Sequence, residues 1–195
     1  MAVSHLSNRL VEVRPLDASR RADFFRLHSD ANGCGWCFCT AWWVPGWDGW
    51  GDRTAEQNRI VRESLLDRGE YDGYLLYVDA EPVGWCQAGP RDRLKKLVQQ
   101  MNLAARPDTW AITCFQIVPK ARRQGFAARL LAEVLRDLCR RGVQRVEVFP
   151  RRGDSLGVDD LWTGPEPMFR SAGFDVIRDD PKRPVLAIDL TLQSC

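Results

Sequence analysis

The strongest constraint on the fold is a strand, a tight turn and a long amphipathic helix that follow one another in the second half of the chain. Residues 110–118 are rich in β-branched and aromatic types and end at Pro119, which predicts a strand. From Ala127 onward, apolar residues recur at spacings of three and four, which predicts a helix with one buried face that ends near Gly142. Residues 143–149 then read as another strand, so this region predicts an α/β arrangement.

The rest of the chain adds further strands and helices around this unit. Thr54 and Gln57 form a capping box, which predicts the start of a helix that stops near Gly69. Two β-rich runs, 74–78 and 83–87, flank a four-residue turn and predict a hairpin. Further strands are expected at 10–14, 174–177 and 185–190, and further helices at 17–28, 94–101 and 165–172. The pattern as a whole predicts an α/β domain with a mixed sheet.

Length and charge limit the classes of protein to consider. The chain has 195 residues, and at about 150 residues per domain a single domain over 1–195 is expected. The 28 basic and 26 acidic residues give a net charge of +2, too small for the basic field of a nucleic-acid or anionic-membrane binder. Neither a bilayer-length apolar stretch nor an export signal is visible. We expect a cytoplasmic monomer or homodimer with no nucleic-acid or membrane partner.

The turn before the long helix has the chemistry of an anion site. A helix start leaves its first backbone N–H groups without internal partners and carries a positive pole. Gly125 lets the backbone approach a ligand closely, Ala127 adds little bulk, and Arg122 and Arg123 add donors that match phosphate oxygens. The alternative is an ordinary helix start with two solvated arginines. The strand before the turn and the helix after it favour a pyrophosphate site.

Two short runs carry a resemblance to a known family. Residues 117–127 read IVPKARRQGFA, and residues 168–174 read MFRSAGF. In content and order they resemble the core signature and the carboxy-terminal helix of the GNAT superfamily of acyl-CoA-dependent N-acyltransferases, over roughly residues 10–190. The resemblance implies a GNAT-like mixed, mostly antiparallel central sheet with helices on both faces. It also implies an N-acetyltransferase that uses acetyl-CoA as cofactor and lets a primary amine, most simply that of a small molecule, attack the thioester directly.

The resemblance also implies which residues contact the cofactor. The backbone of the strand before the turn would pair with pantetheine, the amides of the turn would hold the pyrophosphate, and the next strand would splay away to leave a gap for the thioester. The expected cofactor contacts are Gln116, Ile117, Val118, Arg122, Arg123, Gln124, Gly125, Phe126, Ala127 and Phe169.

Proton transfer needs its own residues, because an ammonium group must lose a proton before it attacks. Glu147 lies in the middle of the strand at 143–149 and is the candidate base; a salt bridge to Arg145 or to another arginine across the sheet is its structural alternative. Asp159 and Asp160 are weaker candidates. Phe169 stands where the family often has a tyrosine acid. Either the thiolate leaves unprotonated, or water or a cysteine such as Cys114 donates the proton, or the chain does not catalyse the standard reaction.

A segment at about 31–53 is rich in tryptophan, cysteine and glycine and is expected to be an irregular, packed insertion. Five of the eight tryptophans lie within fifteen residues, at 36, 42, 43, 47 and 50. In the family this connection forms a wall of the acceptor pocket, so Trp36 and Trp43 are expected to contact the acceptor. Indoles could hold a cationic acceptor over a ring face. The alternative is that these rings only fill the core.

The same segment contains Cys34, Cys37 and Cys39. They could bind a metal with His28, Cys86 or Cys114 as the fourth ligand, but structural zinc usually takes two separated pairs, and only one tight cluster is present. No metal is therefore expected, and buried free thiols are the default. A non-catalytic CoA-binding module that uses these cysteines for metal binding or redox sensing is the alternative function.

Overall fold

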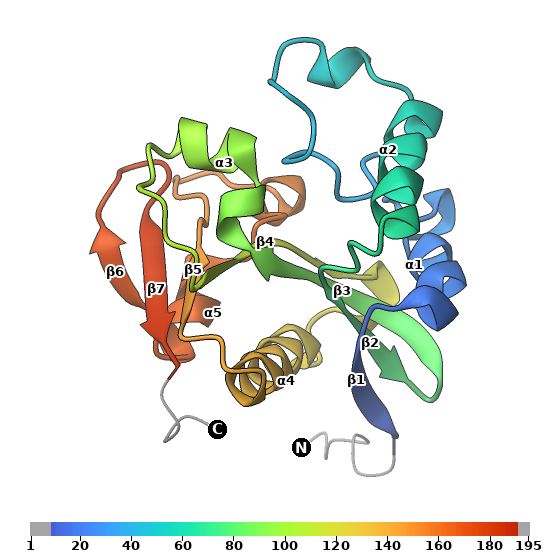
Figure 1. Ribbon diagram of the computed structural model, residues 1–195. Coiled ribbons are helices and arrows are strands. Elements are labelled where there is room, and N and C mark those ends of the chain that lie inside the picture. The colour runs from blue at the N-terminus through green and yellow to red at the C-terminus, as the bar shows by residue number, and fades with distance from the viewer. Residues whose placement is uncertain (1–8, 191–195) are drawn as a thin grey trace.

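The computed structural model describes residues 9–190 and has a mixed α/β architecture (Figure 1). Short 3₁₀ turns join some of the regular elements. In chain order these elements are β1 (Val11–Pro15), α1 (Arg21–Leu27), α2 (Ala55–Asp67), β2 (Tyr74–Val78), β3 (Glu81–Pro90), α3 (Lys95–Gln100), β4 (Thr109–Ile117), α4 (Phe126–Arg140), β5 (Arg145–Val148), α5 (Glu166–Ser171), β6 (Asp175–Arg178) and β7 (Val185–Asp189).

The strands form one seven-stranded sheet in the order β1-β2-β3-β4-β5-β7-β6. Every neighbouring pair is antiparallel except β4 and β5, which run parallel. The crossover between these two strands is α4, as a parallel pair requires. The sequence-based expectation of a mixed, mostly antiparallel sheet is confirmed.

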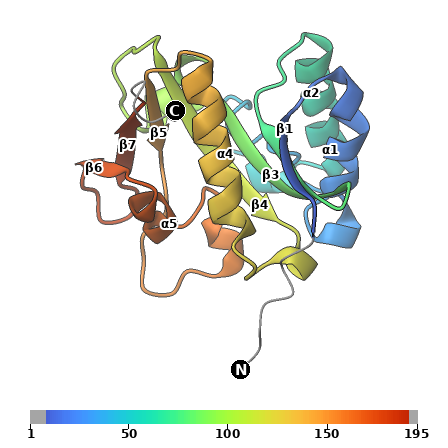
Figure 2. The ribbon, with the colours of Figure 1, turned by 90° about the horizontal axis from the view of Figure 1, so that it is seen from below.

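Helices cover both faces of the sheet. On β2, the Tyr74 hydroxyl donates to Asp137 of α4 at 2.8 Å, whereas the Tyr77 hydroxyl donates to Asp23 of α1 at 2.7 Å. The two tyrosines thus point to opposite faces, and Figure 2 shows α4 lying across the side of the sheet away from α1 and α2. The apolar stripe of α4 is buried as its spacing predicts, with Leu130, Leu131, Val134, Leu135 and Leu138 in the main core.

The capping box at the start of α2 is confirmed, since Thr54 Oγ1 accepts from the Gln57 N–H at 3.1 Å and Gln57 Oε1 accepts from the Thr54 N–H at 2.9 Å. Between α1 and α2 the chain forms only short 3₁₀ turns, Asp30–Asn32 and Trp50–Asp52. This loop, residues 28–54, is therefore irregular, as its glycines predict.

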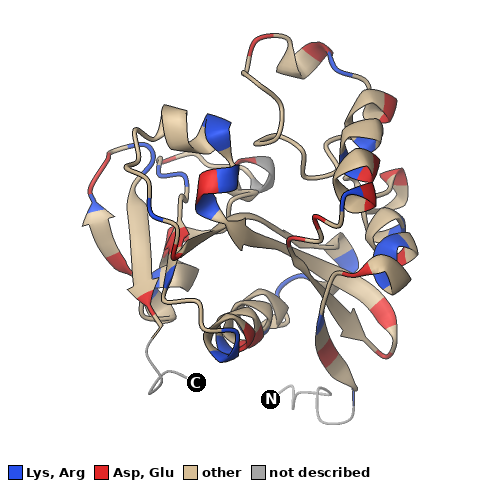
Figure 3. Cartoon of the chain, viewed as in Figure 1, with Lys and Arg blue, Asp and Glu red and all other residues tan. Residues whose placement is uncertain are grey.

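Basic and acidic residues are interspersed over the helices and strands (Figure 3). Within residues 9–190, no helix has the length and apolar character needed to cross a bilayer.

Candidate active site

The turn between β4 and α4 presents a row of backbone N–H groups. Arg123 and Gly125 have φ values of 60° and 78°, and this left-handed backbone turns successive amides toward the start of α4. Within the described residues, the N–H groups of residues 123–128 have no protein acceptor. Since a helix start also carries a positive pole, the turn can bind a diphosphate.

The residues of this turn differ in which of their groups can reach a ligand. A Cβ on Gly125 would meet no atom within 4 Å, so the space in front of the turn is open. Arg122 donates through Nε to the Ile117 carbonyl at 2.9 Å, which fixes the side chain and leaves its terminal nitrogens for a ligand. The ring of Phe126 is buried in the core, so this residue can contribute only its N–H to the turn.

A gap opens where β4 and β5 separate. The two strands pair only from Thr109 and Arg145 to Ile112 and Val148, whereas β4 continues to Ile117 with β3 on its other side. The edge of β4 that faces β5 is therefore free of strand partners beyond Ile112. A free strand edge is a template for an extended ligand with amide groups.

Two hydrogen bonds fix the direction in which the amides of β4 point. The Phe115 N–H donates to the Trp162 carbonyl at 2.7 Å, across the open edge. Successive residues of a strand turn their N–H groups to opposite edges, so the Ile117 N–H points to the same side as that of Phe115. The Val118 N–H donates to the Val83 carbonyl of β3 at 2.9 Å. Of the three backbone contacts expected at 116–118, Ile117 thus offers the free donor, and Val118 does not.

A cavity of about 560 Å³ lies beside this gap. Its walls come from the loop at 28–54, from β4, and from the segments before α5 and before β7. It is lined by Gly33, Cys34, Trp36, Cys37, Cys39, Ala41, Trp47, Trp50, Gln100, Cys114, Arg151, Trp162 and Arg183. No carboxylate, histidine or tyrosine is among them. The cavity contains thiols, indoles and two guanidinium groups.

Buried polar side chains of α2 hold the loop in place. Arg62 is fully buried and donates to the carbonyls of Phe38 at 2.9 Å and Cys39 at 2.7 Å, and to Gln87 Oε1 at 2.8 Å. Phe38 and Cys39 have φ values of 44° and 52°, a conformation that costs about 1 kcal/mol or more per residue. The bonds from Arg62 offset this strain and fix the position of the Cys39 side chain.

The thiols of the cavity form a connected group with His28. Cys39 Sγ lies 3.0 Å from Cys114 Sγ and 3.4 Å from His28 Nε2. His28 Nδ1 contacts the Phe24 carbonyl at 3.0 Å, and because a carbonyl only accepts, Nδ1 carries the hydrogen and Nε2 accepts from Cys39. The full burial of the ring lowers the pKa of His28 to about 3, so it is neutral at pH 7. In the sequence, His28 is only one of three candidates for a fourth metal ligand, and its contact with Cys39 is visible only in the fold.

Cys34, Cys37 and Cys39 are protonated at neutral pH. Burial raises the pKa of Cys34 and of Cys39, and the hydrogen bond with Cys39, followed by burial, raises the pKa of Cys37 well above its usual value. They can donate protons, but they are poor nucleophiles and poor metal ligands. Cys34, Cys37, Cys39, Cys86 and Cys114 are free, and no three His, Cys, Asp or Glu side chains within the described residues are arranged to hold a metal ion.

Glu147 belongs to a buried ion pair and does not line the cavity. Its carboxylate is 3% exposed and accepts from Arg91 Nη1 at 2.8 Å and from Arg145 Nε at 3.3 Å. Arg91 also bonds Asp92, and Arg145 also bonds Asp189. A base must reach the proton that it abstracts, so the geometry favours the structural alternative over the expected catalytic role of Glu147.

A sequence-family model matches residues 36–156, and its description is the acetyltransferase (GNAT) family. The chain belongs to this GNAT family. The match contains the turn at 123–128, both strands at the gap and most of the loop at 28–54, and the acyl donor of the family is acetyl-CoA. No curated protein matches the sequence significantly.

Solved structures of other GNAT proteins share the fold. The PaiA N-acetyltransferase of Thermoplasma acidophilum, in complex with coenzyme A, aligns with a TM-score of 0.51 at 14% identity over 92% of this chain and 99% of that chain. An N-acetyltransferase of Staphylococcus aureus gives 0.52 at 11% over 93% and 99%. Agmatine N-acetyltransferase gives 0.55 at 12% over 92% and 99%. At these identities the likeness shows the fold alone.

The two tryptophans expected to contact the acceptor of this GNAT protein lie in different places. Trp36 lines the cavity and donates through Nε1 to the Arg53 carbonyl at 2.8 Å. Trp43 does not line it, and packs instead on a second core cluster beside Leu97. For Trp43 the core-filling alternative therefore holds.

The expected cation over an indole is present, but it is internal. Lys96 of α3 is buried, with Nζ 3.4 Å from the centroid of Trp47 and 5.6 Å from that of Trp50. It donates to the carbonyls of Ala41 at 2.9 Å and Gly46 at 2.6 Å. Burial lowers the pKa of Lys96 to about 8, so it is still mostly charged at pH 7. Lys96 thus links the loop to α3 through the Trp47 ring and the two carbonyls.

Phe169 does not have the position expected of a cofactor contact. Its ring is fully buried between Phe115 and Phe174, with centroid distances of 6.0 and 5.5 Å. A Cβ on Gly164 would lie 2.5 Å from this ring, so the glycine lets the segment before α5 approach. Phe169 therefore supports the wall that carries Trp162 and presents no surface of its own. The Asp159 side chain lies outside what the structure describes, and Asp160 pairs with Arg151.

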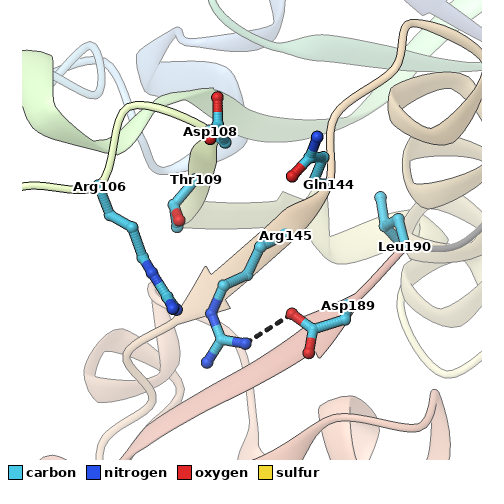
Figure 4. A pocket seen from close by; sticks show the side chains of 7 residues that line it. All are labelled: Arg106, Asp108, Thr109, Gln144, Arg145, Asp189 and Leu190. Carbon is cyan, nitrogen blue, oxygen red and sulfur yellow. Dashed lines mark hydrogen bonds and ion pairs between the residues drawn. The ribbon is translucent and has the colours of Figure 1, made fainter.

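Sequence reasoning missed the cavity residues from distant parts of the chain: Gln100, Arg151, Trp162 and Arg183. No motif marks them, because Gln100 ends α3 and the other three lie in connections, and all four reach the cavity only through the packing of the whole fold. A second cavity, of about 450 Å³, lies at the opposite end of β4 and β5, where Thr109 and Arg145 begin these strands (Figure 4). It is separate from the gap.

Proposed function

We propose that the chain is an acetyl-CoA-dependent N-acetyltransferase that acetylates a primary amine of a small molecule by direct attack. The observation that carries the proposal is the sequence of three features along one path. Unpartnered amides at 123–128 lead to the open edge of β4, and this edge leads to the cavity lined by Cys114. A diphosphate, an extended diamide arm and a thioester follow one another in the same order in acetyl-CoA.

In this proposal the backbone does most of the cofactor binding. The amides of the turn and the terminal nitrogens of Arg122 hold the pyrophosphate, and the Ile117 N–H donates to an amide carbonyl of the pantetheine arm. The arm then lies along the edge of β4 toward Cys114. We also propose that residues 1–195 form a single domain, and that the segment at 31–53 forms one wall of the acceptor pocket.

The chemistry of the cavity restricts the mechanism. Among the residues whose side chains the structure describes, no carboxylate or histidine lines it. In this proposal the amine therefore reaches the thioester in its neutral form, having lost its proton to solvent. Its nitrogen bonds to the thioester carbonyl carbon and gives up a second proton, the carbon–sulfur bond breaks, and the leaving thiolate takes a proton, so the products are an amide and CoA thiol. Cys114 lies on β4 in the cavity wall with Cys39 beside it, and its S–H can supply the proton to the thiolate and be restored by the one that the nitrogen loses.

The test combines binding and turnover. Calorimetry measures CoA affinity, and release of CoA thiol is followed from acetyl-CoA across a panel of primary amines. Binding together with thiol release supports the proposal. CoA binding without thiol release from any amine would favour the non-catalytic alternative, and absence of CoA binding would remove both.

A further inference from the structure

Arg183 is a cation without a protein partner in the wall of the acceptor cavity. It follows the turn between β6 and β7, where its backbone N–H donates to Asp180 Oδ1 at 2.7 Å. No hydrogen bond or ion pair joins its guanidinium to another residue of the described range 9–190. Its Nη1 atom has no contact with solvent and no acceptor. Protein atoms cover Nη1, but the Arg183 side chain as a whole is half-buried and lines the cavity, so a ligand can reach the other N–H groups of its guanidinium.

Carboxylates lie close by in the chain, but other groups use them. Arg152 bonds both oxygens of Glu166 at 2.8 Å and also Asp179 at 2.7 Å. Asp180 accepts from the backbone N–H groups of Lys182 and Arg183. The arrangement thus satisfies Arg152 fully and leaves Arg183 unpaired.

The charged side chains among the lining residues of the cavity are both arginines. Arg151 also lines it and pairs with Asp160, and none of the side chains that the structure describes in this wall is a carboxylate free to face Arg183. Burial, with a smaller contribution from Arg151, lowers the pKa of Arg183, but a guanidinium stays charged at every physiological pH. Arg151 and Arg183 are the charged side chains among the lining residues, and Arg183 is the one without a partner, so the cavity as described is suited to an anionic group.

We propose that the acceptor is an amine that also carries a carboxylate, and that Arg183 binds this carboxylate while the amine points toward Cys114. The inference rests on the proposed function and adds the substrate class to it. A guanidinium presents two parallel N–H groups that match a carboxylate, which would orient the acceptor along the cavity. Trp36 and Trp162, which line the same cavity, suit an acceptor with a flat apolar body.

The first experiment measures binding and does not depend on turnover. Calorimetry with the CoA-loaded protein compares N-acetyl-L-tryptophan with N-acetyl-L-tryptophanamide, two probes that differ only in the carboxylate. We expect the carboxylate probe to bind about 10- to 100-fold more tightly, the range of a hydrogen bond to a buried charge. The preference should disappear in Arg183→Gln. It should persist in Lys182→Gln, the matched control, which removes the same charge from an exposed neighbour outside the cavity wall.

Three results would overturn the inference. They are equal binding of the two probes, no binding of either at millimolar concentration, and an unchanged preference in Arg183→Gln. Thermal unfolding gives a further check, because loss of an unpaired buried charge should leave Tm unchanged or raise it. A clear fall in Tm for Arg183→Gln, but not for Lys182→Gln, would mean that the guanidinium has a structural partner.

Turnover separates this inference from the proposed function. With acetyl-CoA, kcat/KM for L-tryptophan should exceed that for tryptamine in the wild type, and the ratio should approach one in Arg183→Gln. Equal values in the wild type would overturn the carboxylate inference and leave acetyl transfer intact. Thiol release from neither these amines nor any other primary amine would instead remove the proposed function.

Discussion

Replacing Glu147 with glutamine separates a structural role from a catalytic one. The change removes the charge that faces Arg91 and Arg145 at a site where the Glu147 and Arg91 side chains are each 3% exposed. Breaking a buried ion pair from one side costs about 3–5 kcal/mol, and we expect the lower end, about 3 kcal/mol, because Arg91 keeps Asp92. In a chain of this size 1 kcal/mol shifts Tm by about 2–4 °C, so Tm should fall by about 6–12 °C.

The assay is thermal unfolding by circular dichroism, together with kcat measured well below the lowered Tm. Glu81→Gln is the matched control, because Glu81 pairs with Lys120 at the surface, where both side chains are more than half exposed. The control should change stability by less than about 1 kcal/mol. The reasoning would be refuted if Glu147→Gln kept its Tm while kcat fell at least a hundredfold, since that pattern belongs to a catalytic base.

Three further changes test the turn, the thiols and the buried histidine. Gly125→Glu and Gly142→Glu place the same residue at φ values of 78° and 77° in open space, so each variant should lose about 1–2 kcal/mol of stability. Only Gly125→Glu should bind CoA more weakly in calorimetry. Equal CoA affinities of the two variants would exclude the turn as the pyrophosphate site. Cys114→Ala should lower kcat by about ten- to a hundredfold if the Cys114 S–H protonates the thiolate. Cys86 is a buried thiol outside the cavity wall, so Cys86→Ala should leave kcat unchanged. An equal loss of kcat in both variants would mean that Cys114 acts only through packing. The pKa of His28 is about 3 in the folded chain and 6.5 when the ring is exposed, so between these pH values only the unfolded chain binds a proton on His28. The free energy of unfolding should therefore fall as the pH drops below 6.5, by up to about 1.4 kcal/mol per pH unit. Denaturant unfolding of His28→Leu should lack this component, and an identical pH dependence would contradict the burial of a neutral ring.

Several features of this protein could be predicted because they depend on residues that are neighbours in the chain. The capping box of α2 is a contact between Thr54 and Gln57, and the apolar stripe of α4 follows directly from its spacing. The amides at 123–128 face outward because Gly125 and the helix start fix the local backbone. Such features need no knowledge of the rest of the fold.

For other residues the sequence left alternatives open, because it could name a residue but not decide its partner. The segment at 28–54 contains the tryptophans of an aromatic wall, yet the cation on Trp47 comes from Lys96 in α3. Glu147 has the strand position of a base, yet its carboxylate forms an ion pair with Arg91, which lies 56 residues earlier in the chain. Phe169 is in the family's motif position, but the packing of Phe115 and Phe174 covers its ring.

The order of the elements, the mixed sheet and the turn before α4 can be derived from the amino-acid sequence, because short-range hydrogen bonding and periodic burial encode them locally. Which charges neutralise one another and which remain free depends on the folded arrangement of the whole chain. Arg183 is unpaired because the neighbouring carboxylates bond Arg152 and backbone amides instead. Which group each carboxylate bonds depends on how the β6–β7 turn packs against the segment after β5. Charge pairing across a fold is a long-range geometric result, so it becomes visible only once every strand is in place.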